Sequence, residues 1–232
     1  MELYPGSGCT LLTRMVKYGQ SSTEEATQVT PIKNKELYEK IKEKVKQDPN
    51  NPDVYKEMGN LFYTEGKFDL ALEEYYKAIK CDETYYKAYN NIGNVYSKLD
   101  EFSKAKEILR KAIEIYPGYP KAMINLSLVF QKEGNFPEAE RVLIELLEQS
   151  PDNMDAYVNL ATLYRELGSY QRGIEILKDA LEKFGDDEDI FYNLGNMYYD
   201  VDSFKKSREC YLKTLELNPT DDRTMNNLAD TL

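Results

Sequence analysis

The sequence predicts an all-α protein built as a solenoid of antiparallel helix pairs. A ten-residue segment that starts at Asn51, NPDVYKEMGN, returns four more times at intervals of 34 residues, with no insertion or deletion. Within each interval, large apolar residues follow the 3.6-residue period of an α-helix. The 232 residues are 41% apolar and 31% charged, which is enough apolar material for a core. Stacked repeats of this kind bury a continuous core between neighbouring units.

The first helix of each repeat is predicted from apolar residues at positions 4, 7 and 11, counted with Pro52 as position 1. In the first repeat these are Tyr55, Met58 and Phe62, whose spacing puts them on one helical stripe. Position 8 is small in every repeat, which lets another helix approach closely. The residues at position 8 are Gly59, Gly93, Ser127, Ala161 and Gly195.

The second helix follows after a short turn that often contains glycine, such as Glu65-Gly66-Lys67. Position 20 of the repeat is small and position 24 is large, as in Ala71 and Tyr75. Proline at position 32 stops the second helix, since it cannot continue the helical hydrogen bonds. The prolines at this position are Pro117, Pro151 and Pro219.

Together these positions resemble the tetratricopeptide repeat, whose signature is an aromatic residue, Leu-Gly and Tyr, followed by Ala, an aromatic residue, Ala and Pro. The resemblance implies a right-handed α-solenoid and a protein that binds other proteins. It covers residues 52–221 as five repeats. Their expected bounds are 52–85, 86–119, 120–153, 154–187 and 188–221.

The two ends of the chain depart from the repeat. Residues 34–51 are expected to form a lone capping helix with a charged outer face, and residues 1–33 a flexible tail. Residues 222–232 are expected to form the first helix of a truncated sixth repeat, in which Met225, Leu228 and Leu232 form an apolar edge without a covering helix.

Composition excludes several classes of function. Without histidine the chain can form no Ser-His-Asp triad and no histidine metal site, although catalysis by carboxylates alone survives this exclusion. The repeat supplies a fold but no chemistry of its own, so we expect no catalytic residue, no metal and no cofactor. The net charge of −11 argues against nucleic acid and anionic membranes as partners. Three widely spaced cysteines and the lack of an apolar stretch of membrane-spanning length favour a cytoplasmic protein. The carboxylate pairs Asp186-Asp187 and Asp221-Asp222 are interpreted as helix caps.

In the family that the repeat resembles, first helices line a concave groove through positions 2, 5, 6, 9, 12 and 13. At these positions the repeats over 86–153 carry lysine and amide side chains and no acid, whereas those over 154–221 carry several acids. A basic segment is therefore predicted within an acidic protein. Its polar residues are Lys87, Asn90, Asn91, Asn94, Lys98, Lys121, Asn125 and Lys132.

Position 6 is asparagine from the second repeat onward, including Asn159 and Asn193. An amide has both donors and an acceptor, so a row of amides can pair with the backbone of an extended peptide of any sequence. The alternative is that asparagine is simply common at this position of the repeat.

A sharper pattern joins Lys56, Asn60, Asn91, Lys121 and Asn125. Their spacing is similar to that of the carboxylate clamp of co-chaperone repeat domains, which binds acidic C-terminal tails. The fifth position is a basic residue in that family and an asparagine here, which removes a forked cationic donor. The alternative interpretation is that Lys56 and Lys121 are solvated surface lysines.

Three functions remain open from the sequence. The first is a non-enzymatic adaptor that binds an extended or C-terminal segment of a partner protein in the groove. The second is a self-assembling scaffold, a homo-oligomer formed through the apolar edge over 222–232. The third is the targeting arm of a larger enzyme.

Overall fold

The structure is a computed structural model in which residues 32–231 are described, and every regular element among them is an α-helix. The expected flexible tail over 1–33 lies almost wholly outside the described residues. The chain divides into two units, Met1–Glu83 and Thr84–Leu232. The described helices of the first unit are α2 (Lys35–Gln47), α3 (Pro52–Thr64) and α4 (Phe68–Cys81). Those of the second unit are α5 (Tyr86–Lys98), α6 (Phe102–Ile115), α7 (Pro120–Lys132), α8 (Phe136–Gln149), α9 (Met154–Glu166), α10 (Tyr170–Phe184), α11 (Glu188–Asp200), α12 (Phe204–Leu217) and α13 (Asp222–Ala229).

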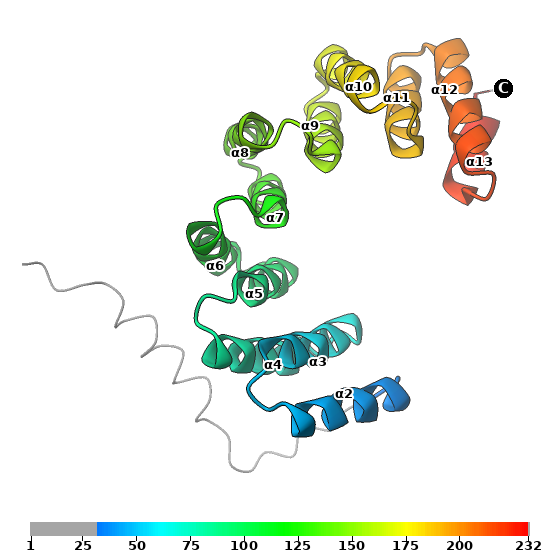
Figure 1. Ribbon diagram of the computed structural model, residues 1–232. Helices are drawn as coiled ribbons and strands as arrows, with labels where there is room; N and C mark the ends of the chain where they lie inside the picture. Colours follow the sequence, from blue (N-terminus) through cyan, green and yellow to red (C-terminus); the bar gives the residue numbers. More distant parts are fainter. Residues whose placement is uncertain (1–31, 232) are drawn as a thin grey trace, which may run out of the picture. The chain divides into compact units, whose positions relative to one another are not determined.

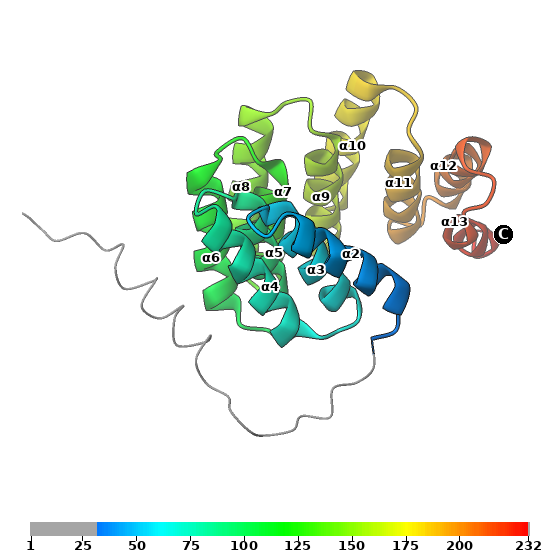
Figure 2. The same ribbon diagram turned by 60° about the horizontal axis from the view of Figure 1, so that its bottom comes forward.

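In the first unit, α3 packs against α4 as a helix pair, and the lone helix α2 packs on α3 (Figure 2). The backbone N–H groups of Lys33 and Asn34 donate to Oε1 of Glu65, at 2.9 and 3.2 Å. The Asn34 side chain caps α2 by accepting from the N–H of Leu37. Buried Ile41 anchors the middle of α2, so this helix is fixed to the first repeat at its start and along its length.

In the second unit, each first helix packs against the second helix of its own repeat, and that second helix packs against the next repeat. The first helices also contact one another in succession, from α5 to α7, α9 and α11. Within this unit, α5, α7 and α9 lie on the inner side of the arc, and α6, α8 and α10 lie on the outer side (Figure 1). The alternation confirms the all-α architecture of repeated helix pairs that the sequence predicted.

Carboxylates at the turns between repeats begin the following helices. Asp187 accepts hydrogen bonds at Oδ1 from the N–H groups of Asp189 and Ile190, at 3.0 and 3.1 Å. Asp221 accepts from the N–H of Arg223 at the start of α13. These bonds satisfy donors that the first helical turn leaves unpaired. The interpretation of these acids as helix caps is confirmed.

The small residue at position 8 has a steric reason. A Cβ atom added to Gly93 on α5 would lie 2.5 Å from Cγ of Leu109 on α6, closer than carbon atoms approach in folded proteins. The absence of a side chain therefore allows Leu109, which is fully buried, to pack directly against the α5 backbone.

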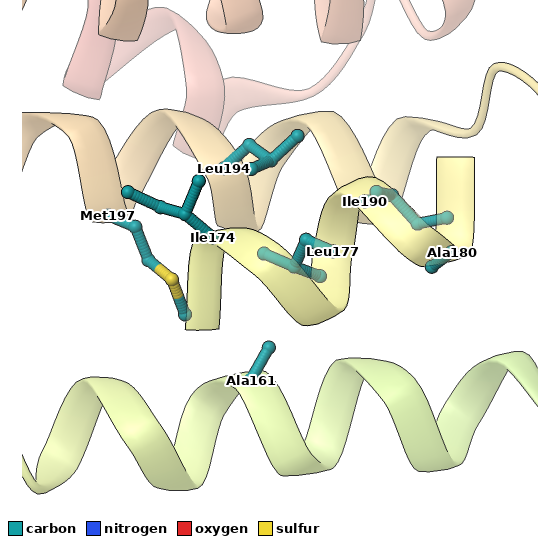
Figure 3. Close-up of a cluster of buried hydrophobic side chains, with 7 residues drawn as sticks. All are labelled: Ala161, Ile174, Leu177, Ala180, Ile190, Leu194 and Met197. Atoms are coloured by element: carbon teal, nitrogen blue, oxygen red, sulfur yellow. The ribbon is translucent and has the colours of Figure 1, made fainter. Parts of the chain in front are cut away.

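The core continues from one repeat into the next. A cluster of buried apolar side chains from α9, α10 and α11 illustrates this continuity (Figure 3). Its members are Ala161, Ile174, Leu177, Ala180, Ile190, Leu194 and Met197. Because each repeat contributes only part of such a cluster, a repeat depends on its neighbours for burial.

Candidate peptide-binding surface

The predicted site residues of the second unit lie on α5, α7, α9 and α11, at positions 2, 5, 6, 9, 12 and 13 of their repeats. We call these positions the first-helix face. Its basic part is formed by four lysines at the two ends of two neighbouring helices: Lys87 and Lys98 on α5, and Lys121 and Lys132 on α7. Within residues 32–231 none of the four forms an ion pair with a carboxylate. Their positive charge is therefore available to a ligand.

The outer helices of the same repeats differ. On α6, Lys106 pairs with Glu133 at 2.5 Å and Lys111 pairs with Glu114 at 3.0 Å. On α8, Arg141 pairs with Glu138 at 2.9 Å. The lysines of α6 and Arg141 on α8 thus have carboxylate partners supplied by the protein, whereas the lysines of α5 and α7 have no carboxylate partner among the described residues. Among the described residues, the uncompensated lysine charges of these two repeats therefore lie on the first helices α5 and α7.

Amide side chains lie between the lysines, and part of their hydrogen-bonding capacity is used inside the protein. Asn125 donates from Nδ2 to Oδ1 of Asn90 at 2.8 Å, and Asn90 donates to Oδ1 of Asn91 at 3.2 Å. Asn90 is only 4% exposed, so it holds α5 and α7 together and contributes little surface. Half-buried Asn94 forms no side-chain hydrogen bond within the part of the chain that the structure describes.

On the following repeats, the amides bond to their own helices. Asn159 donates from Nδ2 to the carbonyl oxygen of Asp155, and Asn193 donates in the same way to Asp189, both at 2.7 Å. Neither side-chain oxygen accepts a hydrogen bond from the described residues. These two asparagines therefore keep an acceptor and part of their donor capacity for a ligand, as a backbone-binding row requires.

Two contacts tie successive first helices together at their C-terminal ends. Lys132 donates from Nζ to the carbonyl oxygen of Ser97 at 3.1 Å and to its Oγ at 3.2 Å. Arg165 forms a forked pair with Asp200, from Nε at 2.5 Å and from Nη2 at 3.2 Å. The hydrogen bonds to Asp200 raise the pKa of Arg165. Both contacts join residues 35 apart. For Arg165 and Asp200, the opposite charges at this spacing were a signal in the sequence that the repeat pattern alone did not reveal.

The predicted clamp residues fall in both units. In the first unit, Lys56 forms an ion pair with Asp53 on the same helix, and Asn60 accepts a hydrogen bond from the hydroxyl of Tyr75 at 2.8 Å. Asn91, Lys121 and Asn125 belong to the second unit. The clamp as a constellation of all five residues stays a prediction.

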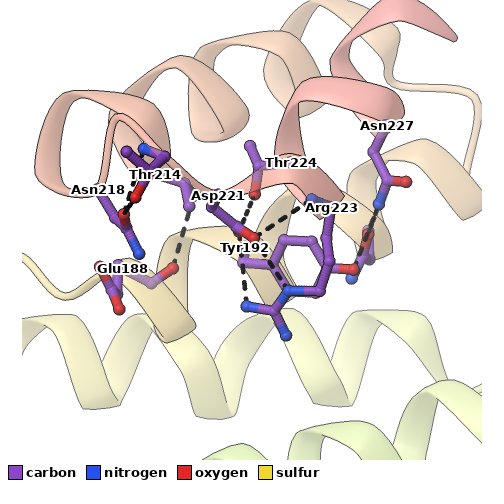
Figure 4. Close-up of polar contacts among 10 residues, drawn as sticks. Glu188, Tyr192, Thr214, Asn218, Asp221, Arg223, Thr224 and Asn227 are labelled. Atoms are coloured by element: carbon purple, nitrogen blue, oxygen red, sulfur yellow. Dashed lines mark hydrogen bonds and ion pairs between the residues drawn. The ribbon is translucent and has the colours of Figure 1, made fainter.

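The last helix is fixed by polar contacts (Figure 4). The guanidinium of Arg223 lies over the ring of Tyr192 at 4.9 Å from its centroid. Asn227 donates to Oδ1 of Asn196 at 3.0 Å, which connects α13 to α11. Met225 on α13 is 43% exposed, so this helix presents apolar surface outward while its polar side chains hold it to the second unit.

Among residues 32–231, no group of three acidic or cysteine side chains is placed to hold a metal ion. No helix in this range is long and apolar enough to cross a membrane.

Comparisons with known proteins agree with this architecture. Family models described as "Tetratricopeptide repeat" match residues 98–164, 130–194 and 188–221, and a model described as "TPR repeat" matches residues 59–100. No curated protein matches the chain.

Solved structures with the same fold include other repeat proteins. A tetratricopeptide repeat protein from Parabacteroides merdae is 16% identical, with a TM-score of 0.68 over 96% of this chain and 80% of its own. The pilF protein of Pseudomonas aeruginosa is 17% identical, with a TM-score of 0.61 over 95% of each chain. YrrB, described as a repeat protein with an unusual peptide-binding site, is 21% identical, with a TM-score of 0.52 over 83% of this chain and 98% of its own. From the family matches and the observed helix pairs, the chain belongs to the tetratricopeptide repeat family.

Proposed function

We propose that the protein is a non-enzymatic adaptor whose first-helix face binds an extended segment of a partner protein. One observation carries this proposal: among residues 32–231 the lysines of α5 and α7 have no carboxylate partner, whereas the lysines of the neighbouring outer helix α6 have one each. The cytoplasm is the proposed location, because the chain has few cysteines and they are widely spaced.

An extended segment suits this face for two reasons. A peptide carries a backbone donor and acceptor at nearly every residue, and it can pair with amides such as Asn94, Asn159 and Asn193 whatever its side chains are. Its carboxylates can form charge-assisted hydrogen bonds with the ammonium groups of Lys87 and Lys121. The fold of YrrB, whose structure is described as having a peptide-binding site, gives further support.

Charge reversal tests the proposal. A labelled acidic peptide is titrated by fluorescence anisotropy against the wild type and the double variant Lys87→Glu/Lys121→Glu. The control is Lys178→Glu/Lys205→Glu, which makes the same change of net charge on exposed positions of α10 and α12. We expect at least about a tenfold loss of affinity in the first variant and much less in the control. An equal loss in both variants would show that only overall charge matters and would contradict a binding site on α5 and α7.

The clamp is the more specific form of the proposal, with an acidic C-terminal tail as the ligand. The peptide with a free C-terminal carboxylate is compared with its amidated form, on the wild type and on Lys56→Ala and Lys121→Ala. Preference for the free acid that both substitutions abolish would support the clamp. Equal binding of the acid and the amide would restrict the proposal to side-chain carboxylates.

A second candidate is a self-assembling scaffold that pairs through α13. Met225 is 43% exposed, whereas Met123 at the same position of an inner repeat is 2% exposed. Light scattering over a concentration series tests this candidate on the wild type and on Met225→Glu. A mass that rises with concentration in the wild type but not in Met225→Glu would support the scaffold. A wild type that stays monomeric at all concentrations would count against it.

A further inference from the structure

The charges on the first-helix face change sign at one place along the second unit. At position 2 of successive repeats, the residues are Lys87, Lys121, Asp155 and Asp189. At position 13, at the other end of the same helices, they are Lys98, Lys132, Glu166 and Asp200. In both rows, the residues on α5 and α7 are therefore positively charged and those on α9 and α11 are negatively charged. Two independent rows change sign between the same two helices.

The acidic part of the face is also largely without partners. Asp155, Glu166 and Asp189 are exposed and form no ion pair within residues 32–231, whereas Asp200 is held by Arg165. The two halves do not neutralise each other, since the described ion pairs contain no contact between the lysines of α5 and α7 and the acids of α9 and α11. Each half of the face therefore keeps an electrostatic field of its own sign, which can attract a ligand of opposite charge.

Apolar side chains lie where the sign changes. Positions 5 and 9 on α7 are Ile124 and Leu128, and position 5 on α9 is Val158. Leu128 is 38% exposed, and Ile124 and Val158 are partly exposed. On α5, positions 5 and 9 are the amides Asn90 and Asn94. An apolar ligand residue would be accommodated best between the two charged halves.

We propose that the ligand is an extended segment with segregated charges, whose acidic part lies on α5 and α7 and whose basic part lies on α9 and α11, with an apolar residue between them. This inference rests on the proposed peptide binding and specifies the chemistry of the partner. Packed helices lie about 8–10 Å apart, and an extended chain rises about 3.3 Å per residue, so such a segment needs roughly ten residues to cross the four helices. Opposite ends of one segment then face opposite charges, and like-charge contacts disfavour a uniformly acidic or basic segment.

The test uses three ten-residue peptides of equal composition, each with four acidic, two leucine and four basic residues. One is segregated, one is its reversed sequence, and one has the charges interleaved. Each carries a fluorescein for anisotropy, and the segregated peptide and its reverse are also made with a photo-reactive benzoylphenylalanine near the acidic or the basic end. The protein is the full chain, with Lys87→Glu/Lys121→Glu and Asp155→Lys/Asp189→Lys as charge-reversed variants. Lys178→Glu/Lys205→Glu is the control that matches the first of these variants in net charge.

We expect the segregated peptide or its reverse to bind at least about tenfold more tightly than the interleaved peptide. We also expect crosslinks from the acidic end on α5 or α7 and from the basic end on α9 or α11. Either charge-reversed variant should remove the preference, and the control should retain it. Equal binding of all three peptides, or crosslinks from both ends spread over all four helices, would overturn the charge order while leaving peptide binding intact.

The test also separates this inference from the proposed function. If none of the three peptides binds, and uniformly acidic peptides also fail, the proposed function is overturned together with the charge order. If the protein self-associates and the charge-reversed variants abolish that association, the occupant of the face is a second copy, and the peptide is the wrong ligand.

Discussion

Asn125 donates a hydrogen bond to buried Asn90 across 2.8 Å and thereby joins the first helices of two successive repeats, α7 and α5. The sequence predicts Asn90 as a ligand-binding residue, and the structure shows that its side chain is buried and joins two helices. The stability of alanine variants distinguishes amides that support the fold from amides that remain available to a ligand.

The first prediction concerns these amides. Asn90→Ala leaves the Asn125 donor without its partner, and we expect the free energy of unfolding to fall by about 1–3 kcal/mol. The matched control is Asn159→Ala, since the Asn159 side chain bonds, within residues 32–231, only to the backbone of its own helix, and alanine favours helix. Urea denaturation of both variants measures the difference. Equal stabilities would contradict the role of Asn90 in joining the helices.

The second prediction concerns a contact between repeats on the outer helices. Arg172 donates from Nη2 to Oε1 of Glu140 at 2.5 Å and to the hydroxyl of Tyr164 at 2.8 Å, and its guanidinium lies 4.2 Å from the centre of the Tyr164 ring. Burial and the bond to Glu140 raise the pKa of Tyr164 to about 12. We expect Arg172→Ala to lower the free energy of unfolding by about 1–2 kcal/mol.

Arg141 provides the control, because its side chain is as exposed as that of Arg172 but its acidic partners lie on its own helix. Pairs of that kind contribute about 0.3–0.5 kcal/mol, so Arg141→Ala should change stability little. Thermal unfolding of the two variants checks the order, and a larger loss for Arg141→Ala would contradict it.

The third prediction separates two reasons why a position of the repeat is occupied by glycine, a close contact with a neighbouring helix and a positive φ. Gly93→Ala places a methyl group against Leu109, and such overpacking costs about 1–3 kcal/mol, which better helix propensity offsets by at most about 1 kcal/mol. Gly134→Ala meets no neighbouring atom, but it forces alanine into a backbone with φ of +80°. Trimming the neighbour with Leu109→Ala should reduce the cost of Gly93→Ala and leave that of Gly134→Ala unchanged. Double-mutant cycles in urea measure the coupling of Leu109→Ala to each glycine substitution. Equal coupling to Gly93→Ala and to Gly134→Ala would refute the steric explanation.

The fourth prediction concerns pH. Burial, with a smaller effect of Glu209, raises the pKa of Cys210 from 9.0 to about 11. Between pH 9.0 and about 11 the folded protein therefore retains a thiol proton that the unfolded chain loses. The contribution of this thiol to the free energy of unfolding is complete below pH 9.0 and is lost as the pH rises to about 11. Iodoacetamide reacts with the thiolate, so Cys210 should be alkylated more slowly at pH 9 in the folded protein than in urea. Equal rates, measured by mass spectrometry of the peptide that contains Cys210, would contradict the burial.

The helix pairs could be predicted because their pattern repeats in register. Gly134 takes a positive φ in the turn where the sequence predicts glycine. The equivalent turns of two other repeats use Asp100 and Asp202, each with φ of +56°, which the glycine pattern does not reveal. Aspartate tolerates this conformation through its short polar side chain, so the turn persists without its usual residue.

The candidate face was predicted less completely than the fold. The lysines could be assigned to it, since their positions follow from the repeat. The engagement of Lys132 by Ser97 and of Arg165 by Asp200 depends on how closely successive first helices approach, and no local pattern encodes that distance. The lysines of α5 and α7 form no ion pair with the described part of the chain, and this observation, on which the proposed function rests, is likewise a property of the packed structure.

The most direct test of the central claim is a ¹⁵N NMR titration of the full chain with a peptide that contains an acidic segment. Binding on α5 and α7 predicts amide shift changes concentrated in 86–98 and 120–132, with far smaller changes in 102–115 and 136–149 on the outer helices. The changes should be absent in Lys87→Glu/Lys121→Glu and retained in Lys178→Glu/Lys205→Glu. Shift changes confined to the outer helices or to α13 would contradict the assignment of the ligand to the first-helix face.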